Sequence, residues 1–291
     1  MLGGVLTAIV TPFDERGAID FDAFAAMCRH LVDNGSDGLV VAGTTGESPT
    51  LDDREKLDLF RAAIDAVGER ATIVANTGSA STAHSVELTE QANELGVDGF
   101  LAVTPYYNKP PQRGIVEHFR AIAAASDRPI VVYNIPSRVV VNIEPETISQ
   151  LAEIPNVRAV KQAYPDLDEA RHIVSEGLDL YAGDDALVLP FLELGGVGGI
   201  CVHTHVVGPQ VAEQVRFARE GDLAAAREID AELRPAYELL GITSNPIPIK
   251  AALALLGHEV GGYRLPLVPP TADELDRVRD CLSRLGLLVA A

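Results

Sequence analysis

The sequence predicts an α/β fold: a closed (β/α)8 TIM barrel with a C-terminal helical extension. Eight short, apolar, β-branched runs recur through residues 1–221, and segments with helical periodicity separate them. The runs are apolar on both faces, which is typical of parallel strands covered by helices. Eight strand–helix units are what a closed barrel requires, with a doubly wound open sheet as the alternative.

The elements follow one another in a regular order. Helical segments such as 21–35 and 51–68 end at glycines that can serve as C-caps. After the helix at 208–222 the strand signal ends. We therefore expect a barrel domain over 1–221 and a three-helix extension over 222–291. The expected strands are 5–13, 37–43, 72–78, 99–106, 129–136, 157–163, 178–185 and 198–206.

Composition excludes several classes of partner and compartment. The formal net charge of −19, spread along 291 residues, argues against nucleic acid or anionic membrane as a partner. No apolar run reaches membrane-spanning length, and the N-terminus lacks a basic leader with a cleavage pattern. The three cysteines show no paired spacing, which favours a reduced, cytoplasmic compartment.

Polar residues gather where the predicted strands end. In barrels of this type the reactive groups lie at the C-terminal strand ends and on the loops that follow. The segments concerned are "GTTGES" (43–48), "TPYYNKPP" (104–111), Tyr133 with "NIPSR" (134–138), Lys161 and "GDD" (183–185).

Of the four lysines, Lys161 is the candidate nucleophile. Lys56 lies on a charged helix face and Lys109 in a loop, so both are expected to be solvated. Lys250 opens an apolar helix, where its stem can cover packing surface. Lys161 alone lies in an apolar strand at the reactive end. The alternative is a structural lysine neutralised by a neighbouring carboxylate.

A buried lysine can act as an amine nucleophile. An ordinary lysine, with a pKa of about 10.4, is neutral in only about one molecule in 2,500 at pH 7. Burial lowers that pKa and frees a lone pair that can attack a ketone. The iminium that forms withdraws electrons, and loss of a proton from the adjacent carbon gives an enamine. Threonine and tyrosine hydroxyls at neighbouring strand ends can move the protons.

Six segments together resemble one known family. "GTTGES", "TPYYNKP", "YNIPSR", the strand-six lysine, "GDD" and "NPIPIK" are similar to the dihydrodipicolinate synthases. These are pyruvate-dependent class I aldolases, a family that includes N-acetylneuraminate lyase. The resemblance covers nearly the whole chain. It implies a Schiff-base condensation of pyruvate with L-aspartate 4-semialdehyde to 4-hydroxy-tetrahydrodipicolinate, in the diaminopimelate and lysine pathway, without a cofactor.

The resemblance also implies roles for catalytic residues. Lys161 matches the residue that captures pyruvate, and Tyr133 matches the general acid/base. Thr45 matches the relay hydroxyl between two tyrosines, and Thr44 helps to hold the hydroxyl network. Tyr107 matches a tyrosine that reaches across a tight dimer interface into the neighbour's site, so a homo-oligomer, a dimer of dimers, is expected.

Substrate-binding residues are implied in the same way. Arg138 matches the guanidinium that receives the carboxylate of the semialdehyde, for which a planar bidentate group is well suited. Backbone groups of Gly183 and Ile200 match those that line the pyruvate pocket.

Two departures from the family pattern stand out. Residues 162–165 read Gln-Ala-Tyr-Pro where the family has an acidic residue followed by Ser/Thr-Gly, which leaves the second substrate less certain. In regulated members a lysine feedback pocket carries histidines, an asparagine and a glutamate. This chain has Asp53, Lys56, Ala80 and His84 there, so inhibition by lysine is predicted to be weak or absent.

Alternative functions remain at this point. His203 and His205 would share a strand face, but no carboxylate partner is evident, so no metal site is expected. "GDD" could bind Mg²⁺, but Asp185 as a helix N-cap is the simpler interpretation. A sister aldolase acting on another aldehyde and a barrel that has lost catalysis are the competing functions.

Overall fold

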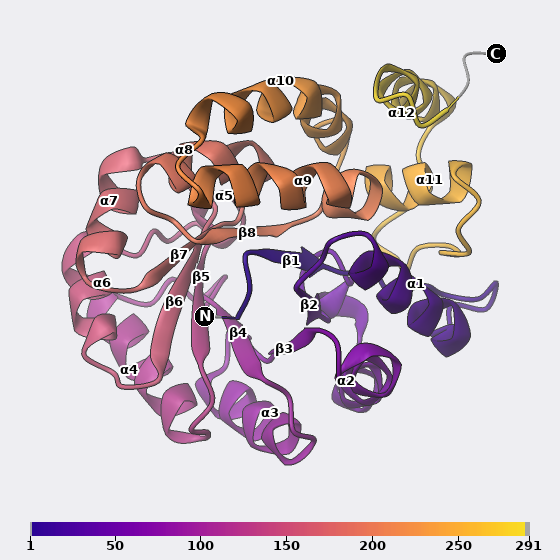
Figure 1. The fold of residues 1–291 in the computed structure, drawn as a ribbon. Helices are drawn as coiled ribbons and strands as arrows, with labels where there is room; N and C mark the ends of the chain where they lie inside the picture. Colours follow the sequence, from indigo (N-terminus) through magenta and orange to yellow (C-terminus); the bar gives the residue numbers. More distant parts are fainter. Residues whose placement is uncertain (1, 289–291) are drawn as a thin grey trace.

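The computed structural model describes residues 2–288 and confirms a closed barrel of eight parallel strands (Figure 1). The strands pair in chain order, and β8 closes the barrel against β1. They are β1 (Val5–Ala8), β2 (Gly38–Val41), β3 (Thr72–Asn76), β4 (Gly99–Val103), β5 (Ile130–Asn134), β6 (Val157–Gln162), β7 (Asp179–Ala182) and β8 (Gly198–Cys201).

Each strand lies inside its predicted run but ends earlier, because the last residues of each run leave the barrel as loops. The difference is largest after β1 and β8; β8 ends at Cys201, and the next helix begins at Thr204. The expectation that His203 and His205 share a strand face is therefore wrong. Both residues lie where the chain turns from the strand into a helix.

Helices surround the barrel and cover the outer faces of its strands (Figure 1). They are α1 (Phe21–Asp33), α2 (Asp53–Val67), α3 (Thr82–Glu94), α4 (Gln112–Ala124), α5 (Pro136–Val139), α6 (Pro145–Ala152), α7 (Leu167–Ser175), α8 (Val188–Glu193) and α9 (Thr204–Arg219), with short 3₁₀ turns η1 (Ser48–Thr50) and η2 (Asp185–Leu187).

Lys56 corrects one prediction. It was expected to be solvated, but only 11% of its side chain is exposed. Lys56 shares a helix face with Leu59, Phe60 and Ala63, all buried, because residues three, four and seven positions apart line one side of a helix. The charged stretch at the start of α2 is therefore not wholly solvated, because Lys56 lies on the side of the helix that faces the core.

Three helices follow the barrel: α10 (Leu223–Leu240), α11 (Ile247–Leu255) and α12 (Ala272–Arg284). α10 packs along α9, and α12 packs on α10 and α11 (Figure 1). The division of the chain at residue 221 stays a prediction. None of the helices within residues 2–288 combines the length and apolarity needed to cross a membrane.

The core has two layers, one inside the barrel and one between the strands and the helices. The inner cluster includes Leu6, Val131, Tyr133, Ala159 and Ile200. On β6 the side chains alternate, so that Ala159 belongs to the inner cluster and Val160 to the outer one. The same alternation sends Lys161 into the barrel, one layer above Ala159.

A buried ion pair joins the C-terminal extension to the loop after β2. The Lys250 side chain, fully buried, donates hydrogen bonds to Glu47 Oε1 at 2.9 Å and to the Thr11 carbonyl at 3.0 Å. Glu47 is also buried and has a left-handed backbone conformation, with φ of 58°. Because Glu47 ends the "GTTGE" turn, Lys250 holds the loop that carries Thr44 and Thr45.

Replacing Lys250 by methionine should lower the free energy of unfolding by about 3–5 kcal/mol, because Glu47 would keep a buried charge without its partner. Urea denaturation measures this. The matched control is Lys109→Met in an exposed loop, expected within about 0.5 kcal/mol of wild type. Equal stability of the two variants would show that the buried pair contributes nothing.

Candidate active site

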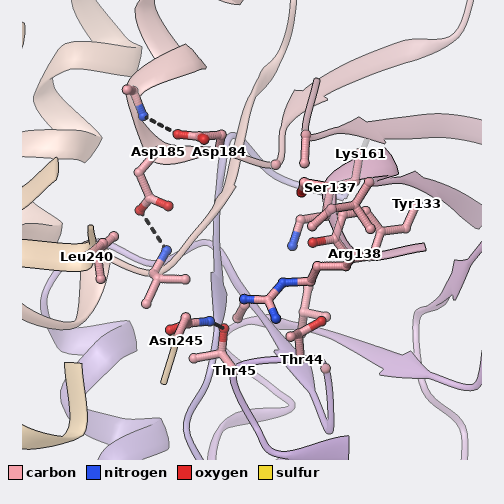
Figure 2. A pocket seen from close by; sticks show the side chains of 18 of the residues that line it. Thr44, Thr45, Tyr133, Ser137, Arg138, Lys161, Asp184, Asp185, Leu240 and Asn245 are labelled. Carbon is pink, nitrogen blue, oxygen red and sulfur yellow. Dashed lines mark hydrogen bonds between the residues drawn. The ribbon is translucent and has the colours of Figure 1, made fainter. Parts of the chain in front are cut away.

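A cavity of about 320 Å³ opens at the C-terminal ends of the strands (Figure 2). Its walls come from the loops after β2, β5, β6, β7 and β8 and from the end of α10 with the segment that follows it. The polar and charged side chains that line it are Thr44, Thr45, Tyr133, Ser137, Arg138, Lys161, Asp184, Asp185, Tyr237 and Asn245.

Lys161 lines this cavity. Its strand neighbours in register are Tyr133 on β5 and Tyr181 on β7. Lys161 is only 5% exposed, and burial, aided by the positive charge of Arg138, lowers the pKa of its amine to about 8. The amine is therefore neutral in roughly one molecule in ten at pH 7.

Tyr133 is the register neighbour whose ring lies close to the lysine amine. Lys161 Nζ lies 4.3 Å from the centroid of its ring. Burial raises the pKa of the Tyr133 phenol, while the charge of Arg138 and a hydrogen bond with Thr44 partly oppose that increase. The phenol is therefore protonated at neutral pH and can serve first as a proton donor.

Gly183 leaves space for the lysine stem. A Cβ atom at this position would lie 3.0 Å from Lys161 Cγ and 3.0 Å from Ala163 Cβ. The Gly183 amide donates to the Gln162 carbonyl at 2.8 Å, which holds the β7 loop against the end of β6. Any side chain here would push against the nucleophile.

Thr45 is held by a residue of the C-terminal extension. It is 2% exposed, and its Oγ1 accepts a hydrogen bond from Asn245 Nδ2 at 2.9 Å (Figure 2). With that lone pair occupied, the Thr45 hydroxyl proton is free to point elsewhere. Asn245 belongs to "NPIPIK", a segment that sequence reasoning treated as structural, with its prolines starting a helix.

Arg138 stands at the mouth of the cavity. It lies on α5, directly after β5, and its side chain extends toward the space that the Lys161 amine faces (Figure 2). Its exposure leaves the guanidinium able to bind a carboxylate from solvent. Its charge also contributes to the lowered pKa of Lys161.

Two predicted residues do not line the cavity of this single chain. Tyr107 is 93% exposed, in a loop where its φ is 70°. Ile200 lies in the inner cluster with Tyr133, beneath the cavity. The cavity therefore brings together Lys161, Tyr133, Thr44, Thr45, Arg138 and Gly183 of the predicted set.

Sequence reasoning missed the contribution of the extension and misassigned Asp185. Tyr237, Leu240 and Gly241, all at the end of α10, line the cavity, and no motif marked them. Asp185 is not an N-cap. Asp184 caps η2 by accepting from the Ala186 amide, whereas the Asp185 carboxylate accepts from the Val202 and His203 amides.

The unusual segment after the lysine affects the cavity less than its sequence suggests. Gln162 is 1% exposed and points away from the barrel interior, accepting from Asn134 Nδ2 at 3.0 Å and donating to Glu169. Among residues 162–165 only Ala163 lines the cavity. Gln162, which stands where the family has an acidic residue, therefore belongs to a polar network outside the cavity.

A second cavity, of about 460 Å³, lies beside the first. It contains Asp53, Lys56 and His84 of the predicted feedback pocket; Ala80 does not line it. Asp53 already accepts from His84 Nε2 at 2.8 Å and lies 3.5 Å from Lys56 Nζ, so its charge is engaged by cationic or donor groups. Weak or absent inhibition by lysine stays a prediction.

Known proteins resemble this chain over nearly its full length. The Dihydrodipicolinate synthetase family matches residues 1–285. The 4-hydroxy-tetrahydrodipicolinate synthase of Moorella thermoacetica is 49% identical over 289 residues, which cover 98% of this chain and 99% of that protein. The enzyme of the same name from Synechococcus elongatus is 45% identical over 292 residues, covering 99% and 98%.

Solved structures agree. The dihydrodipicolinate synthase of Cyanidioschyzon merolae, described with lysine bound, superposes with a TM-score of 0.96 at 44% identity, covering 99% of both chains. The chloride-inhibited enzyme of Acinetobacter baumannii, complexed with pyruvate, gives a TM-score of 0.96 at 33% identity, covering 99% of this chain and 100% of that one. The chain therefore belongs to the dihydrodipicolinate synthetase family.

Proposed function

We propose that the chain is a 4-hydroxy-tetrahydrodipicolinate synthase, a lyase of lysine biosynthesis that joins pyruvate to L-aspartate 4-semialdehyde through a Schiff base on Lys161. The observation that carries this is the buried amine of Lys161 beside the Tyr133 phenol. The full-length relatives at 45–49% identity carry the same enzyme name, which disfavours a sister aldolase or an inactive barrel.

The first half of the reaction builds the nucleophile. The neutral Lys161 amine attacks the ketone carbon of pyruvate. The former ketone oxygen then receives a proton from Tyr133 and leaves as water. The resulting iminium draws electrons from the methyl carbon, which loses a proton and becomes an enamine. Thr44 and Thr45, at the same cavity, are the hydroxyls through which protons pass to and from Tyr133.

The second half joins the two substrates and releases the enzyme. The enamine carbon attacks the aldehyde, and the semialdehyde amine then adds to the iminium carbon and expels Lys161. Arg138 binds the carboxylate of the semialdehyde at the cavity mouth. A local positive charge is needed because a protein of net charge −19 does not attract anionic substrates through its overall field.

The site is completed by a second copy of the chain in this proposal. Tyr107 is exposed in the single chain and outside the cavity, as expected for a residue that contacts a partner. We assign it to the neighbouring site across a tight dimer, with two dimers forming the tetramer. The three cysteines are unpaired and buried, which supports a reducing, cytoplasmic location.

Borohydride trapping with pyruvate tests the nucleophile. Wild-type protein and the matched control Lys109→Arg should gain a reduced pyruvate adduct, mapped by mass spectrometry to Lys161, whereas Lys161→Ala should gain none. Arg138→Leu should still trap pyruvate, because the guanidinium serves the second substrate. Its kcat/KM for the semialdehyde should fall about 10–100-fold through loss of a charge-assisted bond.

The outcomes separate the competing functions. An adduct on another lysine, or none, would reject the Schiff-base proposal. Turnover with a sugar-derived aldehyde in preference to aspartate semialdehyde would identify a sister aldolase instead.

The pH dependence of trapping follows from the pKa of Lys161. The free amine attacks, so the initial rate at low pyruvate should fall about tenfold for each pH unit below 8 and level off above it. Stopped trapping reactions between pH 6 and 9.5 measure this. A rate still rising tenfold per unit at pH 9.5 would mean that the lysine has an ordinary pKa and is not shielded.

Complementation tests the shared site. Lys161→Ala and Tyr107→Phe chains, each weakly active alone, should form mixed dimers with one intact site. Random mixing then restores roughly a quarter of wild-type activity, because the partner's Tyr107 serves the intact Lys161. Activity no higher than the mean of the two variants would place Tyr107 in its own chain's site or outside catalysis.

A further inference from the structure

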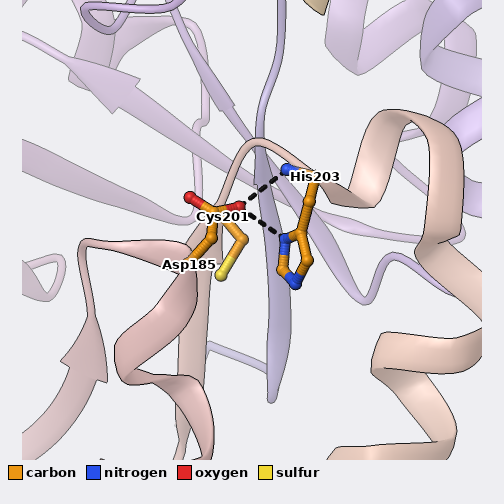
Figure 3. Close-up of side chains that lie close together, drawn as sticks. All are labelled: Asp185, Cys201 and His203. Atoms are coloured by element: carbon orange, nitrogen blue, oxygen red, sulfur yellow. Dashed lines mark hydrogen bonds and ion pairs between the residues drawn. The ribbon is translucent and has the colours of Figure 1, made fainter. Parts of the chain in front are cut away.

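Three side chains of different ligand chemistry meet behind the wall of the active-site cavity (Figure 3). Asp185 begins η2 after β7, Cys201 ends β8, and His203 directly precedes α9. All three are buried, and their ligand atoms lie within 4.8 Å of one another. We propose that they form a binding site for one soft divalent cation of the zinc type.

The carboxylate of this cluster is held in place by the backbone. Asp185 Oδ1 accepts from the amides of Val202 at 2.8 Å and His203 at 2.7 Å, and it lies 2.5 Å from His203 Nδ1. The His203 ring also packs against Tyr237, with 5.6 Å between centroids. Two of the three groups are thus oriented before any ion arrives, which lowers the cost of binding one.

The imidazole of His203 has unmet polar capacity. The residue is 0% exposed; its Nδ1 pairs with Asp185 Oδ1, and its Nε2 has no hydrogen-bond partner within residues 2–288. Such buried polar atoms are rare and call for a partner. His205 offers the contrast, because it accepts from the Val10 amide and donates to the Val202 carbonyl.

The donor set selects the type of ion. Thiolate, imidazole and carboxylate together suit Zn²⁺ or Co²⁺, whereas Mg²⁺ and Ca²⁺ prefer oxygen ligands alone. Two negative ligands neutralise a divalent ion once the Cys201 thiol has released its proton, which suits a buried position. Tetrahedral zinc holds N and O ligands about 3.3 Å apart, so the 2.5 Å approach of Nδ1 to Oδ1 must widen by about 0.8 Å.

Asp185 connects the cluster to the active-site cavity, from which an ion and a water molecule as fourth ligand can enter. Asp185 lines the 320 Å³ cavity as well as the cluster, so an ion and a water molecule can arrive from that side. This site has three protein ligands and one open position, the pattern of zinc sites that exchange their ligands. The proposal does not depend on the Schiff-base reaction, in which Lys161 acts without an ion.

Cobalt titration tests the site directly. Metal-free protein should bind one Co²⁺ per chain and develop a thiolate-to-cobalt charge-transfer band in the near ultraviolet, which Zn²⁺ removes by displacement. Cys201→Ser should lose the band, and its affinity for Zn²⁺ should fall by at least about 100-fold, more than the loss of an outer-shell partner costs. His203→Gln should behave in the same way.

Cys281→Ser is the matched control, since Cys281 lies outside the cluster and should leave the band unchanged. Thermal unfolding without metal verifies that each variant folds, and Zn²⁺ should raise the midpoint of wild type but not of Cys201→Ser. A band that survives in Cys201→Ser would overturn the proposal and place the ion on another cysteine. Binding without any thiolate band would also overturn it and indicate an adventitious ion on nitrogen or oxygen ligands. Borohydride trapping is unaffected by that outcome, so failure of the two proposals can be told apart.

Discussion

The burial of one amine is the constraint on which the site depends. Lys161 is placed inside a closed barrel by the alternation of β6, and the low polarity of that position disfavours its ammonium form. Burying the amine costs free energy, because the same side chain in solvent would be fully hydrated. The result is a much larger neutral fraction of the amine near physiological pH than an ordinary lysine has.

The groups around the amine have opposed electrostatic effects. Arg138 favours the neutral form of Lys161, while the Asp185 carboxylate favours the charged form. Burial shifts the pKa of Lys161 downward and that of Tyr133 upward, so the neutral fraction of the amine rises while the phenol stays protonated at neutral pH. One low-dielectric cavity thereby prepares a free amine and a protonated phenol side by side.

The C-terminal helices belong to the site as much as the barrel does. Asn245 fixes Thr45, the end of α10 forms one wall, and the Lys250–Glu47 pair anchors the threonine loop from behind. A disturbance of the extension therefore reaches the proton relay without touching the nucleophile. The cluster of Asp185, Cys201 and His203 lies along the same boundary, between β8 and α10.

Local pattern alone predicted the eight strands and the choice of Lys161, because strand periodicity and an isolated lysine in an apolar run are visible within a few residues. It favoured a barrel but left an open sheet as the alternative, and the pairing of β8 with β1 decided between them. Tyr133 was also visible as a hydroxyl at a predicted strand end, whereas the role of Arg138 came from the resemblance of its motif to a known family. Only the tertiary structure decided the burial of Lys56 and Lys250, the Asn245–Thr45 bond and the Asp185–His203 contact. The pairs join residues from 18 to more than 200 positions apart, and local sequence patterns do not indicate which distant residues come into contact. The burial of Lys56 depends on which side of its helix faces the core.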